Sequence, residues 1–425
     1  MPGSQPAPDA LASVLLAFGR KVFNSLAVPV LAIFTALIIS GLIIWGSTGD
    51  PTKAFGPKGA FVGLWQGAFG SPRNIAETLT TSTPYIFAGL AVALAFKCGL
   101  FNIGAEGQLA LGAVATAFVG YSLRGLGFPL HLVISLAAGL VAGMIWGAIP
   151  GILKAFRGAH EVIITIMMNY IALLFVQYLL SDAMKDRTPG NVTARTPVIL
   201  KDAEMPLLFQ GTPWQIHWGF ILALLTAVLV YFFLTRTTWG FEIRTVGANK
   251  DAARYAGISV PKNIVLAMGL SGMLAGAAGS VEVLGVTHRH ELGFGSGYGF
   301  DSIAIALLGR NNPFGVVAAA ILFGGLKSGA TKMQFNTQIS GSIISIVQGL
   351  ILLFVAADVI IRWLYRIKVK SETPTLTLAP AAVLAETSLS ELAVSDSSLT
   401  QVSLRPAEPT SPTPEPRPPN PGDGP

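Results

Sequence analysis

The stretch LHLVISLAAGLVAGMIWGAIPGIL (residues 130–153) contains no Asp, Glu, Lys or Arg. A bilayer core takes about 20 apolar residues per helical crossing, so this stretch is long enough to span a membrane once. Backbone polar groups inside a bilayer must bond within the chain, and a helix meets that requirement. Similar stretches follow one another from Val28 to Trp363, with short basic loops between them. The sequence therefore predicts an all-α, polytopic integral membrane protein that moves something across the membrane.

We expect ten spans, which places both chain ends on one side of the membrane. Their predicted ranges are 27–45, 79–96, 100–121, 130–153, 162–180, 218–234, 264–284, 300–309, 314–330 and 339–363. The first span follows Arg20 and Lys21, as the core of a signal peptide would. It is longer than such a core, which has about 7 to 15 residues, and no small-residue cleavage pattern ends it. We therefore expect it to remain as a helix, with residues 1–24 before it in the cytoplasm.

The composition supports a membrane protein. Hydrophobic residues make up 52% of the chain, charged residues 12%, and the mean hydropathy is +0.61. These values exclude a large soluble enzyme. The net charge is +6, but no run of Lys and Arg is interleaved with aromatic residues, so we expect no nucleic-acid partner. The single cysteine, Cys98, excludes an intramolecular disulfide and a multi-cysteine metal site, and it is predicted to be a packing residue.

Basic residues beside the apolar spans set the expected orientation. With the N-terminus in the cytoplasm, the inner side carries Lys154, Arg157, Arg236, Arg244, Lys250, Arg254, Lys262, Arg310, Arg362, Arg366, Lys368 and Lys370. The positive-inside rule favours this orientation. Four basic residues in the outer loop 181–217 count against it. The transmembrane domain is predicted to cover residues 25–365.

The composition changes beyond Lys370. Residues 371–425 are rich in Pro, Ser and Thr, and they end in SPTPEPRPPNPGDGP. Such a sequence has too few apolar side chains to bury a core, so we expect a disordered C-terminal tail. A docking role for this tail is the alternative.

The inner loop IRTVGANKDAARYAGISVPK (residues 243–262) has the features of a short surface helix. Asn249 is a suitable N-cap, Gly257 supplies a C-terminal stop, and Pro261 starts the next span. The alanines of this helix permit close approach by another protein, and its basic side chains offer charge-assisted contacts to acidic groups. An ordinary capped loop helix without a partner is the alternative.

Five segments carry a resemblance to a known family. They are FNIGAEGQLALGA (101–113), EVIITIMMNYIA (161–172), the loop 243–262, EVLGVTHR (282–289) and GFDSIAIALLGRNNPFG (299–315). In this order they resemble permease subunits of bacterial ABC importers for simple sugars, branched-chain amino acids and nucleosides. The match covers residues 25–365, and the AEGQ, MMNYIA and EVLGVTHR segments are most similar to the nucleoside-uptake branch.

The resemblance implies partners for the chain. These are a second permease, two cytoplasmic ATPase subunits and an external solute-binding lipoprotein, assembled at the inner or plasma membrane of a bacterium. It further implies that the loop 243–262 couples the chain to the ATPases through Arg244, Gly247, Asn249, Asp251, Ala252, Ala253, Arg254 and Gly257.

ATP hydrolysis is expected to belong to the partner subunits, with no cofactor bound by this chain. A phosphate-binding P-loop has glycine directly before its lysine. The nearest segment here, Gly324 to Ser328, has leucine at that position and lies in an apolar span. The glycine-rich segment GFGSGYG (293–299) follows no strand and is read as backbone that bends.

Two interruptions of the spans are candidates for the substrate path. One is NIGAEGQ (102–108), and the other is the glycine-rich segment followed by the short span 300–309. Transporters often bind substrate where helices are broken near the membrane midplane, with a matching break in each half of the chain. The second to fifth spans and the seventh to tenth run in opposite senses, which is compatible with an inverted repeat.

Polar side chains within the spans are candidates for lining this path, because a charge at the bilayer centre costs about 2.5 to 3.5 kcal/mol and usually faces protein or water. They are Asn102, Glu106, Gln108, Asn169, Glu282 and Asp301. Interhelical hydrogen bonding is the alternative for Gln108 and Asn169, and capping of the short helix is the alternative for Asp301. We expect no metal site, because His288 and His290 have no evident third ligand.

The predicted function is the permease subunit of an ATP-driven importer of nucleosides. Tyr170, Phe175, Tyr298 and Phe300 lie near the expected path and could stack on a base, although such residues are more often helix-packing residues or interface anchors. Two rivals remain: the same machine carrying a simple sugar such as ribose, and an ion-driven secondary transporter that works alone.

Overall fold

The computed structural model describes residues 29–293 and 297–356. Within these residues the chain is helical, with two isolated β-bridges and no strand. Seven of the described helices are long and apolar enough to cross a membrane. This confirms the all-α, polytopic membrane fold. The predicted N-terminal segment (1–24), the end of the tenth span and the tail (371–425) lie outside the described residues.

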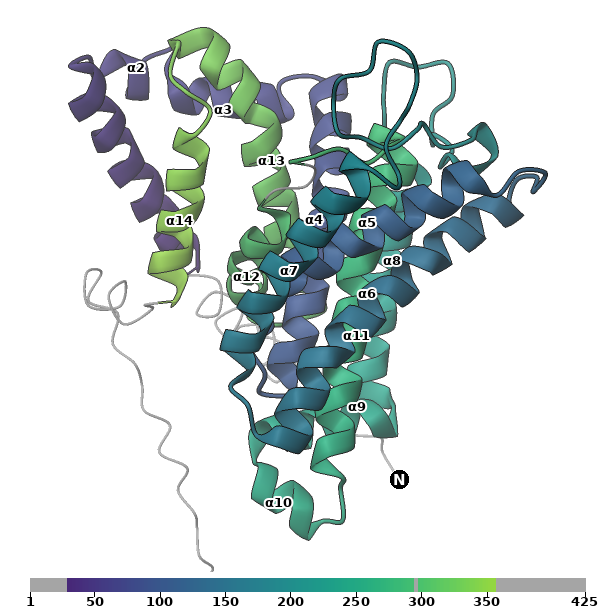
Figure 1. The fold of residues 1–425 in the computed structure, drawn as a ribbon. Coiled ribbons are helices and arrows are strands. Elements are labelled where there is room, and N and C mark those ends of the chain that lie inside the picture. Colours follow the sequence, from purple (N-terminus) through teal and green to yellow (C-terminus); the bar gives the residue numbers. More distant parts are fainter. Residues whose placement is uncertain (1–28, 294–296, 357–425) are drawn as a thin grey trace, which may run out of the picture. The chain divides into compact units, whose positions relative to one another are not determined.

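The helices follow the predicted spans closely (Figure 1). In chain order they are a first helix Pro29–Thr48, α2 (Thr52–Phe55), α3 (Ala60–Phe69), α4 (Pro72–Lys97), α5 (Ala105–Ser122), α6 (Leu130–Arg157), α7 (Glu161–Ser181), η1 (Lys201–Ala203), α8 (Trp218–Arg236), α9 (Thr238–Ala248), α10 (Lys250–Tyr255), α11 (Val260–Glu282), the π-helical turn η2 (Val283–Thr287), α12 (Tyr298–Leu308), α13 (Pro313–Thr337) and α14 (Ile343–Ala356).

Three predicted boundaries were wrong by five residues or more. The third span was placed at 100–121, but α5 begins at Ala105, because the backbone from Cys98 to Gly104 forms turns rather than a helix. The ninth span was ended at residue 330, whereas α13 continues to Thr337. The second span was started at residue 79, whereas α4 begins at Pro72. The surface helix expected between the Asn249 cap and the Gly257 stop is confirmed as α10, and residues 243–248 before it belong to α9.

The helix pairings repeat between the two halves of the chain. In the first half α4 is followed by a break and then by α5, α6 and α7; in the second half α11 is followed by a break and then by α12, α13 and α14. Under this correspondence, the contact of α11 with α6 matches that of α4 with α13, and α11 with α5 matches α4 with α12. The pairs α5 with α7 and α12 with α14 match as well. The packing therefore has the pattern of an inverted repeat.

A glycine seam joins α6 to α11 (Figure 1). Its α6 residues are Gly139, Gly143, Gly147 and Gly151. They recur every four positions and so share one face of the helix. A Cβ atom on Gly143 would lie 2.8 Å from the Cα of Gly276 on α11 and would overlap the carbonyl oxygen of Gly272. Small residues at such spacing let membrane helices approach backbone to backbone, where van der Waals packing replaces the hydrophobic effect.

The outer loop between α7 and α8 is bonded to the segment that follows α11. Its amide donors and their carbonyl acceptors are Thr196 to His290 (2.8 Å), Ile199 to His288 (2.9 Å) and Met205 to Leu284 (2.7 Å). These bonds run along the turn η2 and the residues that follow it. The loop is therefore fixed to the backbone that leads into α12.

His217 lies under this loop as the N-cap of α8. Its Nδ1 accepts a hydrogen bond from the amide of Gly219 (3.1 Å), and its ring packs on Gly285 of η2. The side chain is 1% exposed. Burial, with the nearby His288 as a smaller cause, lowers the pKa of His217 to about 4. The neutral imidazole is the form that the fold requires, because a protonated Nδ1 cannot accept the amide.

Closing the seam with a larger side chain should unfold the transmembrane domain. We expect Gly143→Leu to cost about 3 kcal/mol or more, since it forces two backbones apart. Detergent extraction followed by size-exclusion chromatography should show little monodisperse protein. The matched control is Gly349→Leu on α14, where a Cβ meets nothing within 4 Å. Equal recovery of the two variants would contradict the assigned role of the seam.

Acid should loosen the outer loop through His217. A base whose folded pKa is about 4, against an ordinary value near 6.5, takes up its proton on unfolding. Stability is then complete above pH 6.5, falls as the pH drops below it and levels off near pH 4, with a loss of about 2 kcal/mol at pH 5. Hydrogen-exchange protection of Gly219 and Met205, compared at pH 7.5 and 5, measures this loss.

Two variants control for other titrations. His217→Asn keeps an N-cap acceptor but does not titrate, so the dependence on pH should shrink. His160→Asn, at an exposed position on the other side of the membrane, should leave the dependence unchanged. An unchanged dependence in the His217 variant would refute the assignment.

Candidate functional site

The break between α4 and α5 is held by buried side chains. Asn102 donates from Nδ2 to Gln108 Oε1 (2.9 Å) and to Ser271 Oγ on α11 (2.8 Å). Gln108 returns a bond from Nε2 to Asn102 Oδ1 (3.2 Å), and Ser271 donates to the carbonyl of Ala91 on α4 (2.6 Å). This network ties α4, the break and α11 together.

Asn169 on α7 completes the support of the break. Its Nδ2 donates to the carbonyl of Ile103 (2.8 Å), and its Oδ1 accepts from the amide of Gly107 (2.9 Å). The side chain is 4% exposed. Asn169 thus satisfies one acceptor and one donor that a helix would otherwise have satisfied.

Glu106 links α5 to α12. Its Oε1 accepts from the amide of Gly297 (2.8 Å) and its Oε2 from the amide of Gly299 (2.6 Å). These amides lie at the N-terminus of α12, where unpaired donors and the helix dipole favour a negative charge. A Cβ on Gly299 would overlap the backbone of Glu106, so the two helices abut closely. The two broken helices therefore meet at one carboxylate.

Asp301 lies one turn into α12 and faces α4. Its Oδ2 accepts a hydrogen bond from the hydroxyl of Tyr85 (2.8 Å). The ring of Tyr85 packs edge-on against Tyr298, with centroids 4.7 Å apart. The N-cap of α12 is Gly297, so Asp301 is not a helix cap. The residue is partly exposed.

Lys327 on α13 is the residue of this region that sequence reasoning missed. Its Nζ lies 5.0 Å from the centroid of the Tyr298 ring, a cation–π distance. Its charge acts on both Glu282 and Asp301. The signal was available, because Lys327 is the only charged residue in the predicted span 314–330, and an intramembrane charge marks a functional site. The sequence analysis excluded the segment Gly324 to Ser328 as a P-loop but assigned no other role to this lysine.

The six predicted pathway residues divide into two groups. Asn102, Glu106, Gln108 and Asn169 are buried and bonded within the chain, so their hydrogen-bonding groups support the breaks. Glu282 and Asp301 lie near Lys327 and are partly exposed, and Phe300, the neighbour of Asp301 in the chain, is 49% exposed. We call Glu282, Tyr298, Phe300, Asp301 and Lys327 the midspan cluster. Tyr170 and Phe175 lie elsewhere, on the exposed surface of α7.

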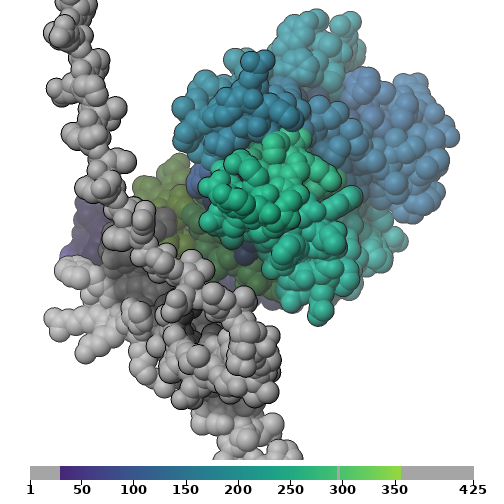
Figure 2. Space-filling model, turned by 90° about the horizontal axis from the view of Figure 1, so that it is seen from below, coloured from purple at the N-terminus to yellow at the C-terminus, as the bar shows by residue number. Residues whose placement is uncertain are grey.

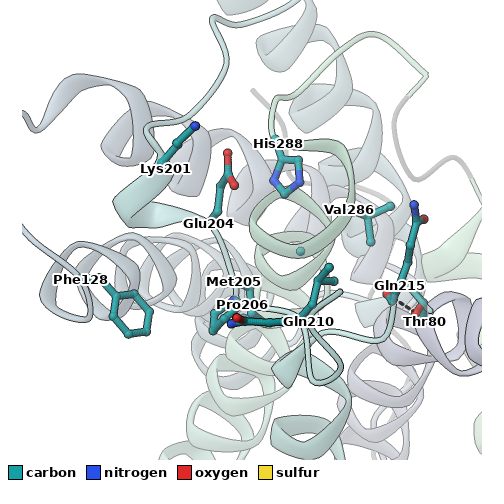
Figure 3. Close-up of a pocket in the computed structure, with 12 residues that line it drawn as sticks. Thr80, Phe128, Lys201, Glu204, Met205, Pro206, Gln210, Gln215, Val286 and His288 are labelled. Atoms are coloured by element: carbon teal, nitrogen blue, oxygen red, sulfur yellow. Dashed lines mark hydrogen bonds between the residues drawn. The ribbon is translucent and has the colours of Figure 1, made fainter. Parts of the chain in front are cut away.

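A cavity of about 620 Å³ opens at the outer loop (Figure 3). Lys201 and Glu204 lie on one side of it, and Gln215, whose carbonyl accepts from the Thr80 hydroxyl (2.9 Å), lies on the other. His288 projects toward it from the end of η2. The cavity thus touches α4, the outer loop and the turn that precedes α12. Among the described residues, no three His, Cys, Asp or Glu side chains gather as metal ligands.

At the opposite end, α9 and α10 are exposed (Figure 2). The predicted cap is confirmed, since Asn249 Oδ1 accepts from the amides of Asp251 (2.9 Å) and Ala252 (3.0 Å). The predicted stop is confirmed too, because Gly257 has φ +77°, which favours glycine. Tyr255, which the sequence analysis did not select, is 95% exposed.

Two residues of the predicted coupling set point inward. Ala253 is fully buried, and a Cβ on Gly247 would overlap the carbonyl oxygen of Lys97. Gly247 packs α9 against the end of α4, and Ala253 lies on the buried side of α10, which contacts α9 and α11. The expectation that Ala253 offers its surface to another protein was therefore wrong. Arg244, Asp251, Ala252 and Arg254 are exposed.

Cys98, at the end of α4, is buried next to this contact, as predicted for a packing residue. Burial raises the pKa of its thiol to about 12, so it stays protonated. Glu161 on α7 pairs with Lys154 on α6 at 2.8 Å, which gives it a structural role.

Comparison with known proteins agrees with this architecture. Residues 74–356 match the family described as branched-chain amino acid transport system, permease component. The guanosine ABC transporter permease protein NupP of Bacillus subtilis is 43% identical over 81% of this chain and 96% of its own length.

Two further relatives are similar over most of their length. The nucleoside ABC transporter permease protein NupB of Lactococcus lactis is 37% identical over 80% of this chain and 92% of its own length. The glucose ABC transporter permease protein TsgB13 of Haloferax volcanii is 34% identical over 77% and 86%. No solved structure gives a significant match. The chain belongs to the permease-component family of branched-chain amino acid transport systems.

Proposed function

We propose that this chain forms half of the translocation pathway of an ATP-driven nucleoside importer in the cell membrane. The observation that carries this proposal is the midspan cluster, which places two carboxylates, an ammonium and two aromatic rings at the meeting point of two broken helices. Two of the similar permeases are named for guanosine and for nucleosides. The chain itself is a non-catalytic transport subunit.

The chemistry of the cluster suits a nucleoside. The Asp301 carboxylate can accept hydrogen bonds from ribose hydroxyls, while Lys327 can donate to a carbonyl or ring nitrogen of a base. The ring of Phe300, which is 49% exposed, offers a face for stacking. The buried supports Asn102, Glu106, Gln108 and Asn169 hold the broken helices in place, so we assign them to positioning.

The exposed surfaces fit the partners that this class of importer requires. Two ATPase subunits would bind the surface of α9 and α10. Gly247 and Ala253 pack beneath this surface. The other residues of the coupling set lie at it: Arg244, Asn249, Asp251, Ala252, Arg254 and Gly257. A second permease would face the exposed side of Lys327 and Phe300. A solute-binding lipoprotein would dock on the outer loop. The ATP is hydrolysed by the partner subunits.

A simple sugar is the second candidate substrate. The permease TsgB13, named for glucose, is 34% identical to this chain. A sugar could bond to Asp301 and Lys327 but has no planar ring to stack on Phe300. An ion-driven secondary transporter would need no ATPase partner, so the exposed α9–α10 surface would have no role in it.

Import by the complete complex should distinguish these substrates. In proteoliposomes that contain all subunits and ATP, labelled guanosine should enter, and a hundredfold excess of ribose should not compete. Asp301→Asn should lower guanosine uptake by about tenfold, since losing one charge-assisted hydrogen bond costs roughly 1.5 to 3 kcal/mol. Competition by ribose would favour the sugar importer.

Two controls accompany this measurement. Asp50→Asn changes a partly exposed carboxylate in the segment after the first helix and should leave uptake unchanged. Uptake by the purified chain alone, driven by an ion gradient without ATPase subunits, would refute the proposal in favour of the secondary transporter.

The surface of α10 should transmit ATP energy. Tyr255→Ala removes a side chain that is 95% exposed and contributes nothing to the core of this chain. We expect the assembled complex to lose about tenfold or more of its uptake per ATP hydrolysed, as interface tyrosines commonly contribute 1 to 2 kcal/mol or more. Simultaneous assays of phosphate release and uptake measure this ratio. Tyr178→Ala, at an exposed position on α7, is the matched control, and an equal effect of both would reject the coupling role.

A further inference from the structure

We propose that a groove between α6 and α8 binds one acyl chain of an anionic phospholipid from the leaflet on the α9–α10 side. The groove has a volume of about 320 Å³. Its floor is formed by α4 and α11, where Phe87, Leu94 and Leu274 line it. Its walls carry Leu140 of α6 and Leu229 of α8. Every lining residue lies on a membrane-spanning helix.

The lining accepts only an apolar occupant. Thr226 on α8 is its one polar residue, and the hydroxyl of Thr226 already donates to the carbonyl of Leu222 in the same helix (2.8 Å). A polar ligand would therefore lose its hydrogen bonds to water and gain none. An acyl chain has no hydrogen bonds to lose, because it only exchanges contacts with other lipid chains for contacts with leucine and phenylalanine side chains.

The length of the groove fits a fatty acyl chain. Along α8 the lining runs from Leu222 to Phe233, which is about 16 Å at 1.5 Å per residue. The hydrocarbon core of a bilayer is about 30 Å thick, so the groove is as long as one leaflet is deep.

The groove faces away from the substrate path. Leu94 follows Tyr85 by nine residues on α4, which turns it to the opposite side of the helix at 3.6 residues per turn. Tyr85 contacts Asp301 and Tyr298 of the midspan cluster. A second permease that closes the path across the midspan cluster would leave the groove open to the bilayer. The occupant is therefore lipid.

The charge at one end of the groove selects the headgroup. Arg236 follows the lining residue Phe233 by three positions on α8, so it lies one turn further along the same side, and it is exposed. Trp239, 53% exposed, lies in the first turn of α9, three residues after Arg236. Arginine and tryptophan at a helix end mark the membrane interface, where the guanidinium can bind a lipid phosphate.

Photo-crosslinking of the complete complex tests this site. The complex is reconstituted in nanodiscs of phosphatidylethanolamine with phosphatidylglycerol that carries a diazirine in mid-chain, and adducts are located by mass spectrometry. We expect adducts on α8 and α11 within the groove. Leu229→Trp should lower them by about tenfold, because the exclusion of two methylenes is enough to weaken chain binding by that factor.

Matched variants separate a specific site from ordinary lipid contact. Leu225→Trp changes the same residue type one turn away, at a position that is 55% exposed and does not line the groove, and should leave the adducts unchanged. Arg236→Gln should lower labelling by the phosphatidylglycerol probe but not by a phosphatidylcholine probe with the same diazirine. Equal labelling of the Leu229 and Leu225 variants, or lipid adducts on other helices with none on α8 and α11, would overturn the proposal. Neither outcome bears on nucleoside transport, which is measured separately.

Discussion

A helix that begins inside a membrane leaves amide groups unpaired where little water can reach them, and this constraint explains the centre of the structure. Both α5 and α12 begin after a break, and each needs side chains to replace the missing helical turn. Glu106 supplies two acceptors to α12, and Asn169 supplies one acceptor to α5. Polar residues that looked like substrate contacts in the sequence are therefore used by the backbone. A few buried side-chain amides and one carboxylate therefore supply the hydrogen bonds that the two breaks remove from the helices.

The rigid frame around the breaks comes from close helix packing rather than from hydrophobic burial. The glycine seam holds α6 against α11, and the matched pair α4 and α13 approaches closely at Gly324, where a Cβ atom would overlap Ser82 of α4. Because α4 and α11 also contact each other, the two halves share one centre. The N-termini of α5 and α12 meet there, which places Asp301, Lys327 and Glu282 beside them. A polar cluster in mid-membrane is stable only in such a frame, since each charged group needs protein or water around it.

Both ends of the molecule connect to this centre through backbone. On the outer side, the loop before α8 bonds to η2 and to the residues leading into α12. On the other side, Gly247 of α9 packs against the end of α4, directly before the first break. Movement imposed on either surface would thus act on a segment adjoining one of the broken helices. This arrangement is what an alternating-access pathway requires, because the site must open to each side in turn.

The sequence by itself determined the membrane class, the order of the apolar helices, the two breaks, and the caps of α10, because apolar length and the chemistry of Asn249 and Gly257 are local properties. It also identified the family, because the five segments that resemble the family and their order along the chain are visible in the sequence. Only the tertiary structure decided which polar residues are used internally, since Asn102 and Ser271 or Glu106 and Gly299 are far apart in the chain. It likewise turned Ala253 inward, exposed Tyr255 and brought Lys327 to Tyr298. Which face of a helix meets a neighbour depends on packing between distant segments, and that information is absent from any single stretch of residues.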